Sequence, residues 1–143
     1  LIGGGETLFQ PVYVGDVAQA VANAVDGRLE PGSTWELGGP ELLTFRQCLE
    51  KMLAVIDRKR GFMTLPFGIA SALGGVLQYL PGAPITPDQV EMLKSDNVVS
   101  DEMKDQGRTL AAMGINGKAV STILPRYLVR FRPHGQFEAT RGL

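Results

Sequence analysis

The shortness of its strand-forming segments restricts the fold of this 143-residue chain more than any other feature. Three β-prone runs stand between helical patterns, at residues 9–14, 34–37 and 62–65. Short strands that alternate with helices are typical of α/β architecture. Three strands of about four residues do not make a stable sheet by themselves. We therefore predict a mostly helical α/β lobe that completes a sheet whose other strands lie elsewhere.

Capping signals predict where the helices begin. Three pairs match the capping box, in which a short polar side chain precedes Gln by three residues: Asp16 with Gln19, Thr44 with Gln47, and Thr86 with Gln89. The second of these helices is expected to end at the cations of residues 58–60. Residues 109–113 predict a short helix that Gly114 ends, and a last helix from Val120 is expected to bend at Pro125.

Composition excludes several classes of function. Hydrophobic residues make up 44% of the chain, enough to bury a core, so a disordered tail is excluded. A net charge of -1 argues against a nucleic-acid partner, because phosphate neutralisation needs a basic face. A single cysteine and a single histidine exclude an internal disulfide and a thiolate zinc site. The carboxylates of Asp101, Glu102 and Asp105 are interpreted as a solvated face rather than an acid–base pair.

The first residues predict a fragment of a longer protein. Leu1 and Ile2 run directly into a glycine turn at 3–5, as at the end of a buried strand, and no initiator Met or signal-peptide pattern precedes them. Gly3–Gly5 is interpreted as a turn and not as a phosphate-binding loop, because a strand rather than a helix follows it. We expect residues 1–143 to form one lobe, with 133–143 as a flexible tail.

Residues 61–87 contain no charged side chain. Proline and glycine interrupt this apolar stretch, so a buried or partner-covered helix is favoured over a membrane span. Phe67, Leu73 and Leu77 are the candidates for a surface that a partner or a membrane covers. Close helix packing is the expected role of Gly74 and Gly75.

Charge is distributed unevenly along the chain. Residues 1–107 carry 8 basic and 14 acidic side chains, whereas residues 108–143 carry 6 basic and one acidic. Arg126, Arg130 and Arg132 gather near the end of the last predicted helix. They are expected either to complement the helix dipole or to dock on an acidic partner or an anionic lipid surface.

Several motifs together resemble one family. They are the run from Gly3 to Ala20 with its Phe9-Gln10-Pro11-Val12-Tyr13-Val14 core, the segment from Trp35 to Thr44, the segment from Thr109 to Ile115, and Leu124-Pro125-Arg126-Tyr127-Leu128. The chain resembles the C-terminal part of extended and atypical short-chain dehydrogenases/reductases, the family of the NAD-dependent epimerases and dehydratases. It is most similar to the branch that holds the epimerase-like accessory subunit of respiratory complex I and its bacterial relatives. The resemblance implies a Rossmann-type sheet whose N-terminal half is absent here.

The resemblance also implies where the cofactor chemistry lies. The glycine-rich NAD(P) loop and the catalytic Tyr-x-x-x-Lys pair of this family belong to the N-terminal half. Tyr13, Tyr79 and Tyr127 are followed four positions later by Val17, Ala83 and Phe131, so none precedes the required Lys. We expect no catalytic, cofactor-binding or metal-binding residue in this chain. NAD or NADP is expected in the protein that contains it.

Four residues are candidates for the substrate pocket by their position in the family: Phe9, Gln10, Pro11 and Tyr13. Sugar-nucleotide epimerases commonly carry Arg at the position of Phe9, where it meets the diphosphate. A phenyl ring cannot donate a hydrogen bond to phosphate. A more apolar ligand, or none, is therefore expected.

Three functions remain open at this point. The chain is a non-catalytic lobe of a complex I accessory or assembly-type protein, the substrate-binding lobe of an active NAD(P)-dependent reductase, isomerase or epimerase, or a free-standing interaction module. The expected partners are the N-terminal Rossmann half, complex I subunits or a membrane surface, and a second copy of the fragment. The resemblance places it in the cytoplasm, at the periphery of the inner membrane, or on the matrix side of a mitochondrion.

Overall fold

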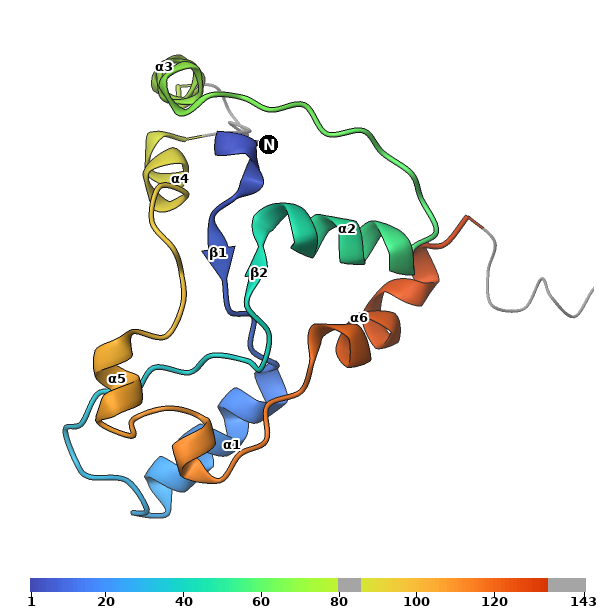
Figure 1. The fold of residues 1–143 in the computed structure, drawn as a ribbon. Helices are drawn as coiled ribbons and strands as arrows, with labels where there is room; N and C mark the ends of the chain where they lie inside the picture. Colours follow the sequence, from blue (N-terminus) through green and yellow to red (C-terminus); the bar gives the residue numbers. More distant parts are fainter. Residues whose placement is uncertain (80–85, 134–143) are drawn as a thin grey trace, which may run out of the picture.

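The computed structural model describes residues 1–79 and 86–133, so the predicted tail lies outside the described residues from position 134 onward. The chain forms six α-helices and two short strands within this part (Figure 1). The helices are α1 (Val14–Val25), α2 (Phe45–Val55), α3 (Phe67–Leu77), α4 (Pro87–Met92), α5 (Asp101–Asp105) and α6 (Val120–Leu128); the strands are β1 (Leu8–Phe9) and β2 (Leu43–Thr44). Short 3-10 turns occupy Gly3–Gly5, Ala111–Met113 and Val129–Phe131. The predicted mostly helical α/β class is confirmed.

The sheet is much smaller than the sequence predicts. β1 and β2 pair antiparallel, with Leu8 opposite Thr44 and Phe9 opposite Leu43. The expected strand over 9–14 is wrong, because pairing stops at Phe9 and α1 begins at Val14. The runs at 34–37 and 62–65 each contribute one isolated parallel bridge, from Glu36 to Thr109 and from Leu65 to Ile2. Each run has strand-like composition but pairs through a single bridge in the described chain.

Local capping signals succeed at two helices. Thr44 caps α2 and Thr86 caps α4. In both cases the side chain of the Gln three residues later accepts the backbone N–H of the capping Thr, which completes the capping box. α2 ends at Val55, before the cations at 58–60 that were expected to terminate it. Gly114 ends the 3-10 turn at Ala111–Met113 with a φ of 73°, as expected of a glycine at this position.

One capping expectation is wrong, and one short helix was not predicted. Asp16 lies inside the first turn of α1 rather than before it, because Tyr13 is the cap residue and provides no side-chain bond. Residues 101–105 form the short helix α5, and the Ser100 side chain caps it by accepting the N–H of Met103. The acidic side chains of this segment, Asp101, Glu102 and Asp105, are exposed, in agreement with the predicted solvated face.

α3 packs on α4 through small residues. Ala70 and Val90 are fully buried, and Gly74 faces the start of α4 so closely that a Cβ there would lie 3.1 Å from the Pro87 nitrogen. The close-packing role predicted for Gly74 is confirmed, whereas a Cβ on Gly75 would meet no atom within 4 Å. Three larger apolar residues of α3, namely Ile69, Leu73 and Val76, are exposed.

The apolar core is small. Seven apolar residues are buried within the described chain, and the main cluster consists of Ala20, Leu110 and Ile115. Thirteen large apolar residues are exposed in the same part of the chain, among them Val76, Tyr79 and Met92 on α3 and α4 or between them. The fold thus leaves more large apolar side chains in solvent than it buries.

Candidate functional site

Gln10 holds together three segments that are distant in sequence. Its side-chain nitrogen Nε2 donates to the carbonyl of Gly39 at 2.8 Å, and its oxygen Oε1 accepts the N–H of Val99 at 3.0 Å. Its backbone N–H donates to the carbonyl of Asn97 at 3.1 Å. This side chain is consequently committed to the scaffold, although its position in the family made it a candidate for the substrate pocket.

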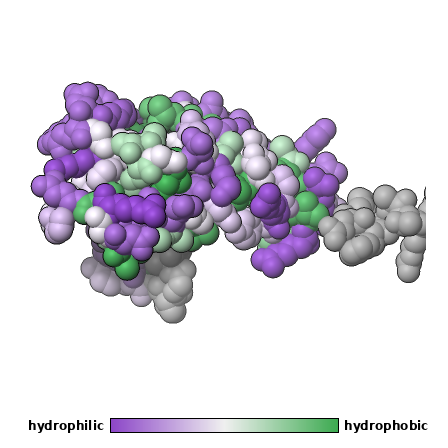
Figure 2. Space-filling view, turned by 90° about the horizontal axis from the view of Figure 1, so that it is seen from below, coloured by the Kyte–Doolittle hydropathy of each residue, from purple (hydrophilic) through white to green (hydrophobic). Residues whose placement is uncertain are grey.

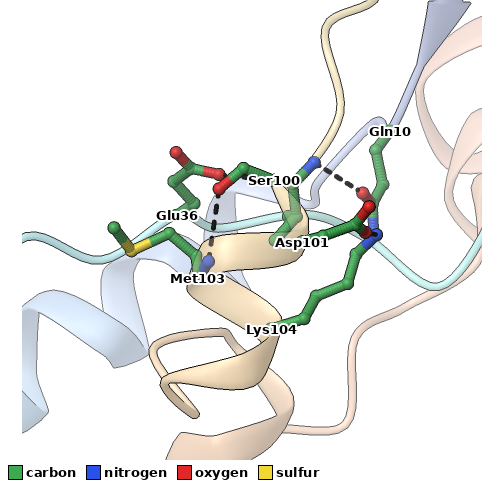
Figure 3. Close-up of polar contacts among 7 residues, drawn as sticks. Gln10, Glu36, Ser100, Asp101, Met103 and Lys104 are labelled. Atoms are coloured by element: carbon green, nitrogen blue, oxygen red, sulfur yellow. Dashed lines mark hydrogen bonds and ion pairs between the residues drawn. The ribbon is translucent and has the colours of Figure 1, made fainter.

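A second polar contact fixes the same region (Figure 3). The Glu36 carboxylate accepts the N–H of Ser100 at 2.7 Å, immediately before α5. Within α5, Lys104 donates to Asp101 at 2.7 Å, and this bond lowers the pKa of the Asp101 carboxyl. The start of α5 is thereby joined to both the Gln10 segment and the segment around Glu36.

These contacts border an open cleft of about 680 Å³. Phe9, Gln10 and Pro11 line it on one side. The remaining lining residues are Val12, Glu36, Leu37, Gly38, Phe45, Cys48, Asn97, Val98 and Val99. Most of this lining is apolar, which is typical of a site for a predominantly apolar ligand.

Phe9 stands at the boundary between this cleft and a second one. Its ring centre lies 5.8 Å from that of Phe45, in a tilted pair. Phe9 and Phe45 also line a neighbouring apolar cleft of about 750 Å³ beside α4. In both clefts the Phe9 position offers a ring and no hydrogen-bond donor, so a phosphate would find no partner there.

Gly38 and Gly39 allow the cleft wall to pack against the Gln10 segment. A Cβ on Gly38 would lie 2.4 Å from the Gln10 side chain, and one on Gly39 would lie 1.8 Å from the Pro11 carbonyl oxygen. No residue larger than glycine fits at position 39 without moving the backbone. The glycine pair therefore sets how closely the two walls approach.

Tyr13 lies apart from the other pocket candidates. It lines a separate small hollow of about 180 Å³ with residues of α6. The Lys118 ammonium stands 4.7 Å from the centre of its ring, and the same ammonium donates to the buried Asp16 carboxylate at 3.2 Å. Tyr13 thus faces the junction of α1 with the segment before α6.

Sequence reasoning did not identify Glu36, Cys48 or Asn97 as cleft residues. Burial raises the pKa of the Cys48 thiol, with Glu41 acting in the same direction and Lys51 against it. A thiol with a raised pKa is a weak nucleophile at neutral pH. No cluster of three or more potential metal ligands occurs among residues 1–79 and 86–133.

The predicted partner surface on α3 is partly covered. The Phe67 ring lies against the glycine turn, where it occupies the space that a Cβ on Gly3 would need. Leu73 is 42% exposed and Leu77 is half-buried. Ile69 and Val76, at 53% and 71%, extend the exposed face one turn to either side of Leu73. No helix in the described chain is long and apolar enough to cross a membrane.

Arg126, Arg130 and Arg132 lie on the exposed surface near the end of α6. Arg132 donates through Nε to the Val55 carbonyl at the end of α2, at 2.7 Å. The Arg130 guanidinium lies 4.9 Å from the centre of the Phe131 ring. Arg132 thus satisfies a free carbonyl of α2, whereas Arg126 and Arg130 have no ion-pair partner among the described residues.

Comparison with known proteins gives no matching family model. Over 94% of its length, the chain is 35% identical to an Arabidopsis thaliana protein named NADH dehydrogenase (ubiquinone) 1 alpha subcomplex subunit 9, mitochondrial. It is 26% identical, again over 94%, to the NADH-ubiquinone oxidoreductase 40 kDa subunit, mitochondrial, of Neurospora crassa. A shorter match, 38% identical over 45% of the chain and 17% of the relative, is to a rice protein named Cyclin-B1-2. The chain spans 35% of the length of each of the first two relatives.

Proposed function

We propose that this chain, which is homologous to subunits of mitochondrial NADH–ubiquinone oxidoreductase, is the C-terminal lobe of an epimerase-like accessory subunit of that complex. The observation that carries the proposal is the 35% identity over 94% of the chain, in the branch that the sequence motifs predicted. In this proposal the lobe supplies contact surface and one wall of a cleft. It performs no hydride chemistry itself.

The cofactor, NAD or NADP, is proposed to bind in another part of the protein that contains this chain. Two features of the described residues support this division. The glycine turn at Gly3–Gly5 leads into β1, so it lacks the helix N-terminus that receives a pyrophosphate. No tyrosine of the chain is followed by Lys at the fourth position. The isolated chain should therefore show no NADH binding in calorimetry, and micromolar binding would contradict this placement.

Exposed apolar surface supports a role in assembly. Ile69, Leu73 and Val76 form one exposed row on α3 while Ala70 and Gly74 occupy its packed side. In a helix that faces water, the outer row is normally polar. We propose that a neighbouring protein surface, either the N-terminal half or another subunit of the complex, covers this row.

The test is co-migration of the full-length protein with NADH dehydrogenase activity in native electrophoresis. Leu73→Asp places a charge in the exposed row, and we expect it to abolish co-migration without unfolding the protein. Val25→Asp is the matched control, because Val25 is 82% exposed at the end of α1, away from α3. Unchanged co-migration of Leu73→Asp, or equal loss in both variants, would contradict the assembly surface.

A second function is favoured by the cleft beside Phe9. Its apolar lining fits an active NAD(P)-dependent enzyme acting on a lipid-like or quinone-like substrate. Oxidation of NADH or NADPH by the full-length protein with such a substrate would favour this second function. Loss of that turnover in Phe9→Asp, with native electrophoresis unchanged, would assign the substrate to this cleft.

A further inference from the structure

The C-terminal end of α2 brings together cations from two segments that are distant in sequence. Arg58 lies three residues after the end of α2, and its N–H donates to the Leu53 carbonyl at 3.0 Å. Arg132 reaches the same helix end from the other segment, through its bond to the Val55 carbonyl. Arg58 and Arg132 therefore meet at this helix end, which brings the segments 58–60 and 126–132 near each other. No local sequence pattern predicts this meeting, since about seventy residues separate the two segments.

We call the six cations at this place the basic end: Arg58, Lys59, Arg60, Arg126, Arg130 and Arg132, all exposed. Six other described cations form ion pairs with Asp or Glu, namely Arg28, Lys51, Lys94, Lys104, Arg108 and Lys118. None of the six in the basic end has such a pair among residues 1–79 and 86–133. Within residues 56–60 and 126–133, Asp57 is the single acidic residue.

Complementing the helix dipole does not require this many charges. The C-terminus of α2 carries the equivalent of about half a negative charge. Arg132 already bonds to the Val55 carbonyl there. The remaining cations repel one another, so the basic end is stabilised when an anionic surface approaches. Five of the six are Arg, whose planar guanidinium matches phosphate oxygens in a two-bond geometry.

Two aromatic side chains stand among these arginines. Tyr127 and Phe131 are 51% and 52% exposed and lie one turn apart at the end of α6. Arg126 and Arg130 precede them by one residue each, so cations and rings alternate along the same helix end. Figure 2 shows hydrophilic and hydrophobic side chains side by side at the right-hand end of the molecule, next to the grey atoms.

We propose that the basic end binds the phosphate headgroups of an anionic lipid surface, with the Tyr127 and Phe131 rings entering between the headgroups. Rings with a polar rim of cations suit the boundary between water and lipid. Charge attraction alone would also suit an acidic protein face, but it would leave the two exposed rings unexplained. This inference does not depend on the proposed function, because it concerns a different surface from α3.

The experiment measures sedimentation of the full-length protein with vesicles of phosphatidylcholine, with and without phosphatidylglycerol. We expect binding to the anionic vesicles alone, weakening as salt rises. Each neutralised cation should weaken binding roughly fivefold. Arg126→Gln with Arg130→Gln should therefore weaken it roughly 25-fold, and so should Arg58→Gln with Lys59→Gln. Lys94→Gln with Lys104→Gln is the matched control, which removes one cation just beyond α4 and one on α5 and should leave binding unchanged.

A second double variant keeps the charges and removes the rings. Tyr127→Ser with Phe131→Ser should weaken vesicle binding while leaving its salt dependence as in the unmodified protein. Thermal unfolding of each variant verifies that the fold is retained. An effect of the 126/130 variant without one of the 58/59 variant would overturn the joint surface. Binding to polyglutamate or to inorganic phosphate, without binding to anionic vesicles, would overturn the lipid assignment.

Discussion

Asp16 is the least exposed charged side chain among the described residues, and both of its carboxylate oxygens have partners in one distant residue. Oδ2 accepts the backbone N–H of Lys118 at 2.8 Å, and Oδ1 accepts its ammonium at 3.2 Å. One residue thereby attaches the start of α1 to the segment before α6. A buried carboxylate is tolerated here because every lone pair that faces the protein meets a donor.

Asp16→Ser distinguishes this attachment from a capping role. Serine is as good a helix cap as aspartate, but its hydroxyl is too short to reach Lys118. The variant should lose about 1–3 kcal/mol in urea unfolding, because the part-buried backbone N–H and the ammonium of Lys118 both lose their partner. Asp101→Ser is the control, since its ion pair is on the surface and its loss should leave the stability unchanged. Equal stability of both variants would contradict the attachment.

The difference between Asp16 and the two threonine caps explains which parts of the fold the sequence predicts. Thr44 and Thr86 bond within three residues, so a local pattern is sufficient to place α2 and α4. Asp16 matches the same pattern, but its partner lies 102 residues away and no local pattern contains it. The residues of the cleft likewise divide into those that a local sequence motif predicts and those that only tertiary packing brings together. Phe9 to Pro11 were predicted from the family, whereas Glu36, Cys48 and Asn97 join them only through tertiary packing.

At the scale of elements, the strand predictions failed because the composition of a segment does not determine whether a second strand lies beside it. Residues 34–37 and 62–65 have the residue types of strands, yet each makes one bridge in the described chain. Strand propensity leads to a strand only where another strand is available for hydrogen bonding.

The helix α5 was missed because its sequence carries little of the usual helix signal. It is five residues long and polar, and the Ser100 cap rather than any apolar periodicity begins it.

Gly74 and Gly75 provide a test of how α3 meets α4. Alanine at either position gains up to about 1 kcal/mol of helix propensity. At position 75 the new methyl group enters open space, whereas at 74 it approaches the Pro87 backbone. We expect Gly75→Ala to stabilise the protein and Gly74→Ala to be less stable than Gly75→Ala by about 1–2 kcal/mol. Similar thermal midpoints for the two variants would show that the helices are not in close contact.

α6 receives its N-terminal cap from another element. Its cap residue, Ala119, has no side-chain acceptor, and the Glu41 carboxylate accepts the N–H of Val120 instead. Burial alone would raise the pKa of Glu41, but the Lys51 ammonium and the backbone donor together hold it below its ordinary value of 4.5. A carboxylate in this position also favours the positive end of the helix dipole.

Glu41 should therefore contribute a pH-dependent part of the stability. A folded-state pKa below the unfolded value means that the unfolded chain binds more protons between the two values. The contribution is fully present above pH 4.5 and is lost as the pH falls through the folded-state pKa. Glu41→Gln should lower the free energy of unfolding by about 1–2 kcal/mol at neutral pH. Between pH 7 and pH 3, the free energy of unfolding from urea should fall less for the variant than for the unmodified protein. Parallel pH profiles for the variant and the unmodified protein would contradict this.

At the scale of the whole molecule, the described chain exposes more large apolar residues than it buries. Tyr79, two residues beyond α3, and Met92, the last residue of α4, are 83% and 72% exposed. Water-exposed apolar surface of this kind promotes association. The isolated chain should therefore self-associate with rising concentration in analytical ultracentrifugation. Val76→Glu should shift it toward the monomer, whereas Val25→Glu on α1 should not.

The hydrogen bonds that anchor the first sixteen residues carry a consequence for the order in which the chain acquires its structure. Leu8 donates to Asp96, Gln10 binds Asn97 and Val99, and Asp16 binds Lys118. Contacts between residues this far apart form slowly, because a long loop must close first. During synthesis, residues 8–16 must therefore wait for residues 96–118 to leave the ribosome. A chaperone that shields β1 in that interval would shorten its exposure to proteases.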